Sequence, residues 1–359
     1  MADRYLLNIG GTYSASTDDI WHSLSNQGVG DGGGFTEAAD RAILDAAAGG
    51  LTVTKVGGMT CQGVLAATHA NTLEVATSID VNGGALQLGA GATVLGAGDI
   101  RSAVDTTVTA GCTMAAWTGA LIMDGTSTLA TGAAYVPTIE INTSGTITLA
   151  GTITSGTLAV TAGTLDNNGQ AVDTADWTIA AGATVTGAGN VAIELDMTVA
   201  AGADLSGFTG TCTFDGGSIL TTNGVALGPL AMDTVGGVTL GSALTCGDIA
   251  IAAGDWVCGG WTIKPGSLTA TGGAIDLGSA YIQPAHGKTL NFTNLAVTNT
   301  AAHIVAAGGT TVTVSNMPNT GVAVIHCHGC ADGGGNDAAS VDFDKHAVPG
   351  SLSAMGAGC

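Results

Sequence analysis

Large side chains are scarce in this sequence. Aromatic residues make up only 4% of the 359 residues, while glycine occurs 59 times. This composition excludes an ordinary thick globular core, because such cores are filled by bulky aliphatic and aromatic side chains. Hydrophobic residues still reach 45%, which is too many for a disordered polymer. A solenoid suits this balance, because each of its coils buries small side chains against the coils above and below.

Positive charge is also scarce. Seven Lys and Arg stand against 28 Asp and Glu, which gives a net charge of −21. Such a chain repels phosphate backbones and anionic membrane surfaces, so we expect no nucleic-acid partner. The sequence has no run of about 18 apolar residues, and its N-terminal apolar stretch is too short for a signal peptide. We therefore expect a soluble protein, without membrane insertion, that is not exported by the usual route.

Cysteines are few and widely spaced. The eight cysteines lie between Cys61 and Cys359 and form no dense framework. Dense frameworks are typical of small secreted domains, so this spacing favours a chain made in the cytosol with mostly reduced, buried thiols. Disulfides are the alternative.

Short strand-like segments fill the middle of the chain. From about residue 51 to 315, runs of four to six Val, Ile, Leu and Thr alternate with Gly, Asn or Asp, and residues 145–172 show the pattern plainly. Alternation of apolar residues with Thr or Ser indicates half-buried strands, and glycine supplies the positive φ of tight corners. The sequence therefore predicts short strands joined by corners.

An internal repeat favours a solenoid over a sandwich. Residues 91–125 align without gaps on residues 182–216, with 16 identities in 35 positions. Asp105 matches Asp196, and Trp117 matches Phe208. We interpret the repeat as a duplication of several stacked coils of roughly 18 to 25 residues each.

Three segments follow from these patterns. Residues 1–50 are expected to form an N-terminal cap or attachment segment, residues 51–315 the repeat body, and residues 316–359 a His- and Cys-rich C-terminal cap. Caps cover the open strand edges of terminal coils. The predicted fold is an all-β, right-handed parallel β-helix (β-solenoid) with small terminal caps. By composition alone, residues 37–49 could be helix or strand.

Motifs at both ends resemble those of a family of phage and environmental-virus structural proteins with glycine-rich β-helical bodies. The N-terminal family pattern is an Arg-aromatic pair, a Gly-Gly motif with two Trp, a glycine-rich stretch and an Asp-led strand. The matching residues are Arg4, Tyr5, Gly10, Gly11, Trp21, Ser23, Gly32 to Gly34 and Asp40 to Ala46, followed at the other end by the closing motif at 330–343. The first Trp of the pattern is missing here, and Leu44 stands where the family has Phe. The resemblance implies a virion component and a strand rather than a helix at residues 37–49.

A His- and Cys-rich run near the C-terminus is the main candidate metal site. In an extended strand His326, His328 and Cys330 point to one face. In phage fibres and spikes, His-x-His strands from three chains can present six imidazoles to one octahedral ion. Zinc or iron would suit such ligands. The competing interpretation is that these residues are simply buried and stacked. Residues 332–337, DGGGND, suggest a calcium loop, but they lack the tandem nonapeptide repeat of calcium-binding β-rolls, so a plain turn is the favoured interpretation.

The serious enzymatic alternative is a tailspike-type polysaccharide depolymerase. Glycosidic cleavage needs two carboxylates, one of them with a raised pKa. The candidate carboxylates are Asp166, Asp173 and Asp176, or Asp248 and Asp255, and the candidate sugar-stacking aromatics are Trp177, Trp256, Trp261 and Tyr281.

The sequences GAGATVLGAG and GAGATVTGAG resemble dinucleotide-binding loops, but strands rather than helices are expected after them.

We therefore expect a non-enzymatic structural protein on the surface of a bacteriophage virion, assembled in the host cytoplasm. Its role would be that of a head decoration, head fibre or tail fibre, without a required cofactor. Expected partners are other copies of the chain, most simply as a homotrimer that covers strand edges, other virion proteins and a host surface glycan. A depolymerase and a bacterial surface adhesin are the alternatives.

Overall fold

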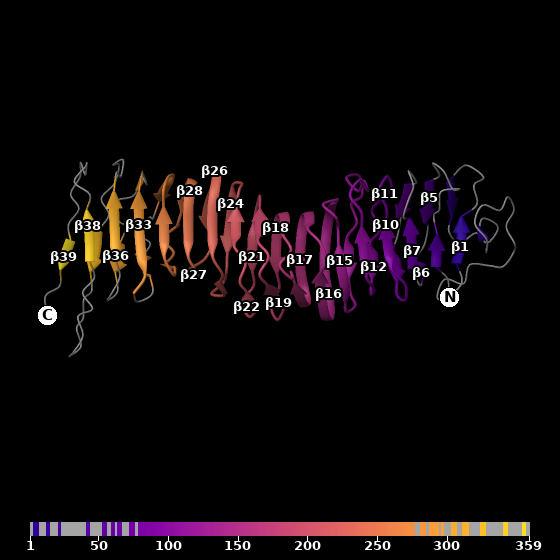
Figure 1. Ribbon diagram of the computed structural model, residues 1–359, viewed down its shortest axis with the longest axis horizontal. Coiled ribbons are helices and arrows are strands. Elements are labelled where there is room, and N and C mark those ends of the chain that lie inside the picture. The colour runs from indigo at the N-terminus through magenta and orange to yellow at the C-terminus, as the bar shows by residue number, and fades with distance from the viewer. Residues whose placement is uncertain are drawn as a thin grey trace. The chain divides into compact units, whose positions relative to one another are not determined.

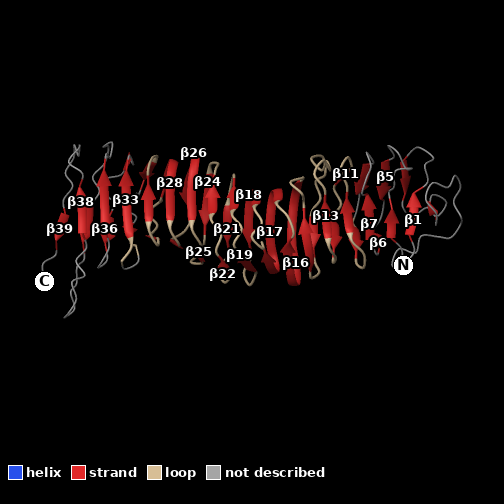
Figure 2. Ribbon diagram, viewed as in Figure 1, coloured by secondary structure: helices blue, strands red, loops and turns tan. Residues whose placement is uncertain are grey.

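The protein is all-β. The computed structural model describes residues 72–75, 78–276, 281–284 and 287–291 with their side chains, except those of 234 and 235, and outside these ranges it assigns strands only. Figure 2 shows strands and turns, and no helix occurs in the described part of the chain. The strands stack as a β-solenoid, which confirms the predicted fold class. Its handedness stays a prediction.

The chain forms two compact units, residues 1–187 and 188–359. The first contains β1 (Asp3–Leu6), β2 (Thr12–Ser14), β3 (Trp21–His22), β4 (Arg41–Ile43), β5 (Thr52–Lys55), β6 (Met59–Cys61), β7 (Gly63–Ala66), β8 (Thr72–Val75), β9 (Ile79–Val81), β10 (Leu86–Leu88), β11 (Thr93–Gly96), β12 (Ile100–Ser102), β13 (Thr106–Val108), β14 (Leu121–Met123), β15 (Ser127–Ala130), β16 (Tyr135–Leu149), β17 (Ile153–Asp166), β18 (Val172–Ile179) and β19 (Thr184–Gly187). Strand β4 lies within 37–49, as the strand interpretation of that segment predicts.

The second unit contains β20 (Val191–Ile193), β21 (Met197–Val199), β22 (Asp204–Phe208), β23 (Cys212–Phe214), β24 (Ser218–Thr221), β25 (Ala226–Leu227), β26 (Leu230–Leu240), β27 (Leu244–Cys246), β28 (Ile249–Val257), β29 (Ile263–Lys264), β30 (Leu268–Ala270), β31 (Ala274–Asp276), β32 (Tyr281–Ile282), β33 (Thr289–Thr293), β34 (Ala296–Val297), β35 (His303–Ala306), β36 (Thr311–Ser315), β37 (Val324–Cys327), β38 (Ser340–Phe343) and β39 (Ala354–Gly356). The predicted segment boundaries near residues 50 and 315 stay predictions.

Parallel register builds the core of the first unit. Figure 1 shows its strands side by side along the chain. One inward column runs through six successive coils, and each of its side chains is at most 1% exposed: Ile79, Ile100, Leu121, Ile139, Leu158 and Trp177. Each fully buried aliphatic side chain stabilises the fold by roughly 1.5–3 kcal/mol. The core is thus a stack one coil wide, as the shortage of large residues predicts.

The second unit repeats this arrangement. Its corresponding column consists of side chains that are at most 3% exposed: Val191, Cys212, Leu230, Ile249, Leu268 and Leu290. The four cysteines whose side chains are described, Cys112, Cys212, Cys246 and Cys258, are free and buried. Burial raises the pKa of each thiol, to about 11 for Cys112 and about 12 for the other three. These thiols therefore stay protonated and behave as small apolar side chains.

The two copies of the internal repeat form the same corners. Asp105 accepts a hydrogen bond from the backbone N–H of Thr128 at 2.8 Å, and Asp196 accepts one from Ile219 at 2.9 Å. In both copies the donor belongs to a following coil. The aspartates that recur in the repeat are therefore corner residues that tie one coil to another, as the sequence indicates.

The glycine-rich sequences also turn corners. Gly96 ends β11 with φ 97° and Gly187 ends β19 with φ 103°, a backbone conformation that glycine adopts without strain. Strands come before these glycines in both copies, and no helix follows in the described residues. A phosphate-binding loop would require that helix.

A second corner position alternates between aspartate and asparagine. Asp99 accepts a hydrogen bond from the N–H of Ala120 at 3.0 Å, and Asn190 accepts the equivalent bond from Thr211 at the same distance. An acceptor oxygen is thus required here, but a negative charge is not.

We predict that Asp99→Ala lowers the free energy of unfolding of the first unit by about 1 kcal/mol, because the Ala120 N–H loses its acceptor. The Asp99→Asn variant is the matched control and should stay within about 0.5 kcal/mol of the parent chain. Urea unfolding followed by circular dichroism measures both variants. If both variants lost the same free energy of unfolding, the negative charge of Asp99, and not its acceptor oxygen, would be what stabilises the corner.

The buried tryptophans differ in their hydrogen bonding. Trp117 Nε1 donates to the carbonyl oxygen of Gly98 at 2.8 Å. Gly119 permits this close packing, because a Cβ there would collide with the same carbonyl oxygen. Trp256 Nε1 is buried and has no hydrogen-bond partner among the described residues.

These environments predict that replacing tryptophan with phenylalanine lowers the stability of the protein by different amounts at the two positions. Trp117→Phe should destabilise the protein by about 1–2 kcal/mol more than Trp256→Phe, because only the first loses a hydrogen bond. Phe208, at the position equivalent to Trp117, is itself buried, so a phenyl ring fits this site. Calorimetric unfolding of the two variants measures the difference, and a larger loss for Trp256→Phe would contradict the assignment.

Candidate functional site

The predicted metal site lies mostly outside the described residues. His326 falls in β37 and its side chain is not described, while His328 and Cys330 lie outside the described strands. The DGGGND segment also lies outside them. Within the described residues, no group of three or more His, Cys, Asp or Glu is placed to hold a metal ion. The zinc or iron site therefore stays a prediction.

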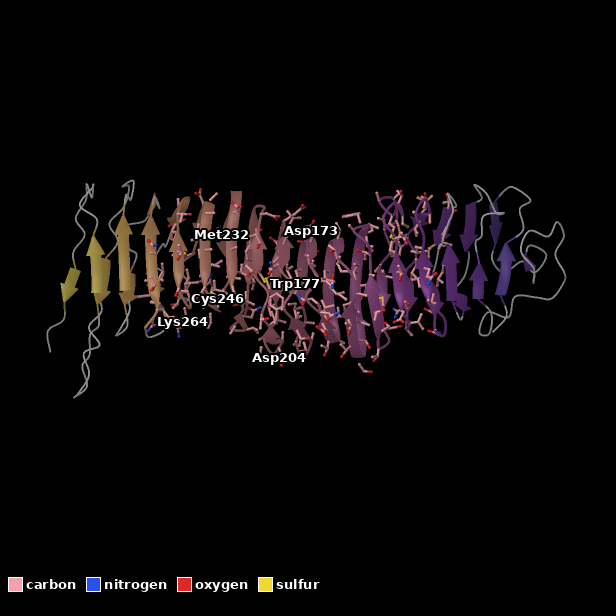
Figure 3. All side chains as sticks on the ribbon, in the orientation of Figure 1. Asp173, Trp177, Asp204, Met232, Cys246 and Lys264 are labelled. Carbon is pink, nitrogen blue, oxygen red and sulfur yellow. The ribbon has the colours of Figure 1, made fainter. Side chains whose placement is uncertain are left out.

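The register separates the predicted catalytic carboxylates. Asp166 lies between Thr148 and Thr186, Asp173 pairs with Thr154, and Asp176 pairs with Thr157. Figure 3 labels Asp173 at the edge of the ribbon, where its side chain is exposed. Each of these three aspartates thus faces a threonine on the coil that precedes it.

The other predicted pair lies along β28. Asp248 precedes this strand and accepts a hydrogen bond from the Ser267 N–H at 2.8 Å, so it serves as a corner acceptor. Asp255 lies seven residues further on, in register with Gly237 and Ala274. The register does not place these two carboxylates opposite each other.

A different pair of carboxylates is brought together in the first unit. Asp80 is the register partner of Arg101, and Asp124 follows β14, which pairs with the strand of Arg101. Both aspartates have a buried Oδ1 with no hydrogen-bond partner in the described part of the chain. We call Asp80, Arg101 and Asp124 the Asp124 cluster. In this cluster two carboxylates and a cation interact across neighbouring coils.

Burial and two neighbouring charges act on the pKa of Asp124. Desolvation raises the pKa of Asp124, the Arg101 guanidinium opposes that rise, and the Asp80 carboxylate adds to it. A carboxyl group with a raised pKa beside a second carboxylate is what a general acid of this kind requires. The sequence itself carries a signal for this cluster, because Asp80 and Arg101 are opposite charges spaced by one coil length of 21 residues.

The four predicted sugar-stacking aromatics divide into two kinds. Trp177 and Trp256 are core residues, each 1% exposed. Figure 3 shows Trp177 within the stack of strands. Trp261 and Tyr281 are 44% and 46% exposed. Only the second pair is available to a ligand.

These two aromatics come from adjacent coils. Ile263 pairs with Ile282, so the register sets Tyr281 beside Thr262, the neighbour of Trp261. Adjacent parallel strands lie about 4.8 Å apart. Trp261 and Tyr281 are therefore exposed on adjacent coils of the second unit, one residue apart in register.

Polar side chains continue this flank. Thr245 pairs with Lys264, and Gln283 donates its backbone N–H to the Ile263 carbonyl at 2.8 Å, which places it beside Lys264 on the next coil. All three side chains are exposed. We call Thr245, Trp261, Lys264, Tyr281 and Gln283 the Lys264 face.

A hollow of about 400 Å³ opens on the Lys264 face. Its lining combines the three polar side chains with residues at the bend that follows: Thr245, Cys246, Lys264, Pro265, Gly266, Gln283 and Pro284. Cys246, Pro265 and Pro284 are buried, so the floor is formed by side chains packed into the solenoid. Figure 3 labels Cys246 and Lys264 close together at one edge of the ribbon.

Backbone hydrogen bonds hold the floor of the hollow. The N–H of Gly266 donates to the carbonyl oxygens of Cys246 at 3.1 Å and Gly247 at 2.9 Å. Proline at 265 and 284 restricts φ at the same bend of successive coils. The face is thus preorganised by the stacking that builds the fold.

Comparison with family models, curated proteins and solved structures gives no match. Among the described residues no helix is long and apolar enough to cross a membrane.

The Asp124 cluster predicts a specific pH dependence. Because the folded state holds the Asp124 proton more tightly than the unfolded chain does, stability should fall as pH rises from the usual aspartate pKa, about 3.9, through the raised folded value. Asp124→Asn should therefore raise the thermal midpoint at pH 7 and have little effect at pH 3.5. Asp215→Asn is the control, since Asp215 is exposed at the equivalent repeat position. If Asp124→Asn raised the thermal midpoint equally at pH 3.5 and pH 7, a raised pKa of Asp124 in the folded state would be refuted.

Proposed function

We propose that this protein is a non-enzymatic structural component of a bacteriophage virion surface, built to hold an adhesive face away from the particle. The observation that carries the proposal is the parallel, in-register stacking of successive coils in the described part of each unit. Buried columns run through coil after coil, so most of each coil's apolar surface serves the stack itself. The viral setting is supported by the resemblance of the motifs at the two ends of the sequence to those of phage structural proteins.

Two features support a role in contact with a surface. Corner aspartates and asparagines tie successive coils together, which resists local opening of the stack. The Lys264 face offers exposed aromatic and polar groups on a rigid floor. A host surface glycan is the partner these groups suit, and assembly as a homotrimer would cover remaining strand edges.

A test of the proposal is the composition of the virion. Mass spectrometry of purified particles should detect this chain at many copies per particle. Antibodies against it should label the particle exterior in electron micrographs. Detection of the chain only in the infected cell, and not in purified virions, would contradict the proposal that it is a virion component. Association with the outer surface of uninfected bacteria would support the adhesin alternative.

The Asp124 cluster favours a second candidate function, a depolymerase. It brings two carboxylates beside one arginine, and desolvation raises the pKa of Asp124, as a general acid requires. If this candidate is correct, the purified protein should release reducing ends from host capsular polysaccharide, and Asp124→Asn should abolish the release. Undiminished release by that variant would exclude this cluster as the catalytic site.

A further inference from the structure

We propose that the Lys264 face binds a neutral glycan, with pyranose rings laid along the stacking direction of the coils. The inference deepens the proposed function, since it names the chemical class that the adhesive face recognises. It depends on the residues of this face alone and can be tested on the purified chain.

The aromatic pair supplies a stacking surface. Trp261 and Tyr281 expose nearly half of their surface at adjacent coils, although large hydrophobic side chains are costly to leave in water. The C–H groups on one side of a pyranose ring carry partial positive charge, and the face of an aromatic ring is negative. Sugar rings therefore stack on exposed Trp and Tyr, which bury apolar carbons while the hydroxyl groups stay hydrogen-bonded.

The polar column supplies hydrogen bonds beside that surface. Lys264 donates, while Thr245 and Gln283 can both donate and accept. Sugar hydroxyl groups do both as well, so this mixture matches them. Because the three residues stand on three successive coils, they span about 10 Å along the stack. This length is close to that of a disaccharide.

The hollow has a size that fits this ligand. Its volume of about 400 Å³ lies at the lower end of small-ligand sites, and roughly one or two pyranose rings fill such a space. Thr245, Lys264 and Gln283 line the hollow but neither aromatic residue does, so the stacking surface extends the site beyond it. The advance per coil is similar to the advance per sugar in an extended β-linked chain. Successive rings can therefore meet successive coils in the same way.

Charge selects neutral over acidic sugars. The whole chain carries a net charge of −21, which repels polyanions approaching from solution. Asp248, next to Gly266 at the edge of the hollow, adds a carboxylate whose oxygen accepts the Ser267 N–H. The hollow has two lysines beside it, Lys264 and Lys288, because the pairing of Leu268 with Leu290 sets Lys288 beside Gly266. Both can donate to sugar hydroxyl groups, while the net charge of the whole chain disfavours an anionic polysaccharide.

The test is binding of defined oligosaccharides to the purified full chain. Saturation-transfer NMR and tryptophan fluorescence are recorded with cellotetraose, maltotetraose and N-acetylchitotetraose, and with a hyaluronan tetrasaccharide as the acidic probe. We expect at least one neutral probe to bind and to perturb tryptophan emission. Binding of the acidic probe alone, or of no probe, would overturn the proposal.

Variants locate the site. Trp261→Ala and Lys264→Ala should each weaken binding by about tenfold or more, as truncation of a central contact does. Trp261→Tyr should recover most of the affinity, because the stacking surface remains. Tyr135→Ala is the matched control, since Tyr135 is 47% exposed in the other unit. Circular dichroism and thermal unfolding confirm that each variant is folded.

Each result can be distinguished from a failure of the viral assignment. Equal loss in Tyr135→Ala and Trp261→Ala would show nonspecific binding and refute the site. Neutral-glycan binding that requires Trp261 would stand even if the chain were absent from virions. Conversely, a virion protein that binds none of the four probes would keep the structural proposal and lose this inference.

Discussion

Parallel hydrogen bonding between successive coils is the constraint on which the rest of this structure depends. Each coil fixes the position of the next, so a residue at one point of a coil faces the corresponding residue about 4.8 Å away along the stack. Sequence spacing is thereby converted directly into spatial columns. The apolar core, the corner acceptors and the Lys264 face are all columns of this kind. A shift in register by one residue would turn every core side chain outward.

This constraint also explains how a protein so poor in aromatic residues can be stable. A globular core needs large side chains because it must fill a volume in three dimensions. In these units the distance across a coil is short, so Val, Ile and Leu fill it. The few buried tryptophans occupy single positions in a column, as Trp177 does above Leu158. Glycine is then required mainly at corners such as Gly119, where one backbone passes close to another.

Much of the fold could be predicted from the sequence, and less of the site. The alternation of small apolar residues, the glycine corners and the repeat at residues 91–125 predict the solenoid, because all three are local or periodic signals. The repeat also identifies Asp105 and Asp196 as corner residues. Which of Trp256 and Trp261 is buried could not be predicted, because both lie near glycines and apolar residues. Their exposure depends on where each coil turns, and corner positions vary by one or two residues.

The candidate carboxylates show the same limit. Proximity in sequence suggested Asp166, Asp173 and Asp176, but residues close in sequence can lie on different sides of a coil. Asp80 and Asp124 are 44 residues apart in the sequence and lie near the same arginine. Such pairs can be predicted only when the length of each intervening coil is known. A difference of one to three residues in coil length is enough to change which residues stand opposite each other.

The threonines flanking the aspartates have a consequence for self-association. In the described registers, carboxylates on strands face uncharged residues or arginine, as Asp166 faces Thr148 and Asp80 faces Arg101. Like charges directly opposite each other destabilise a sheet, so this spacing lets an acidic chain stack upon itself. A strand of another protein, or a second copy paired in a different register, would instead place carboxylates opposite each other, and these would repel. The spacing of the carboxylates thus favours in-register stacking of the chain's own coils. It disfavours the edge-to-edge aggregation to which open parallel sheets are prone.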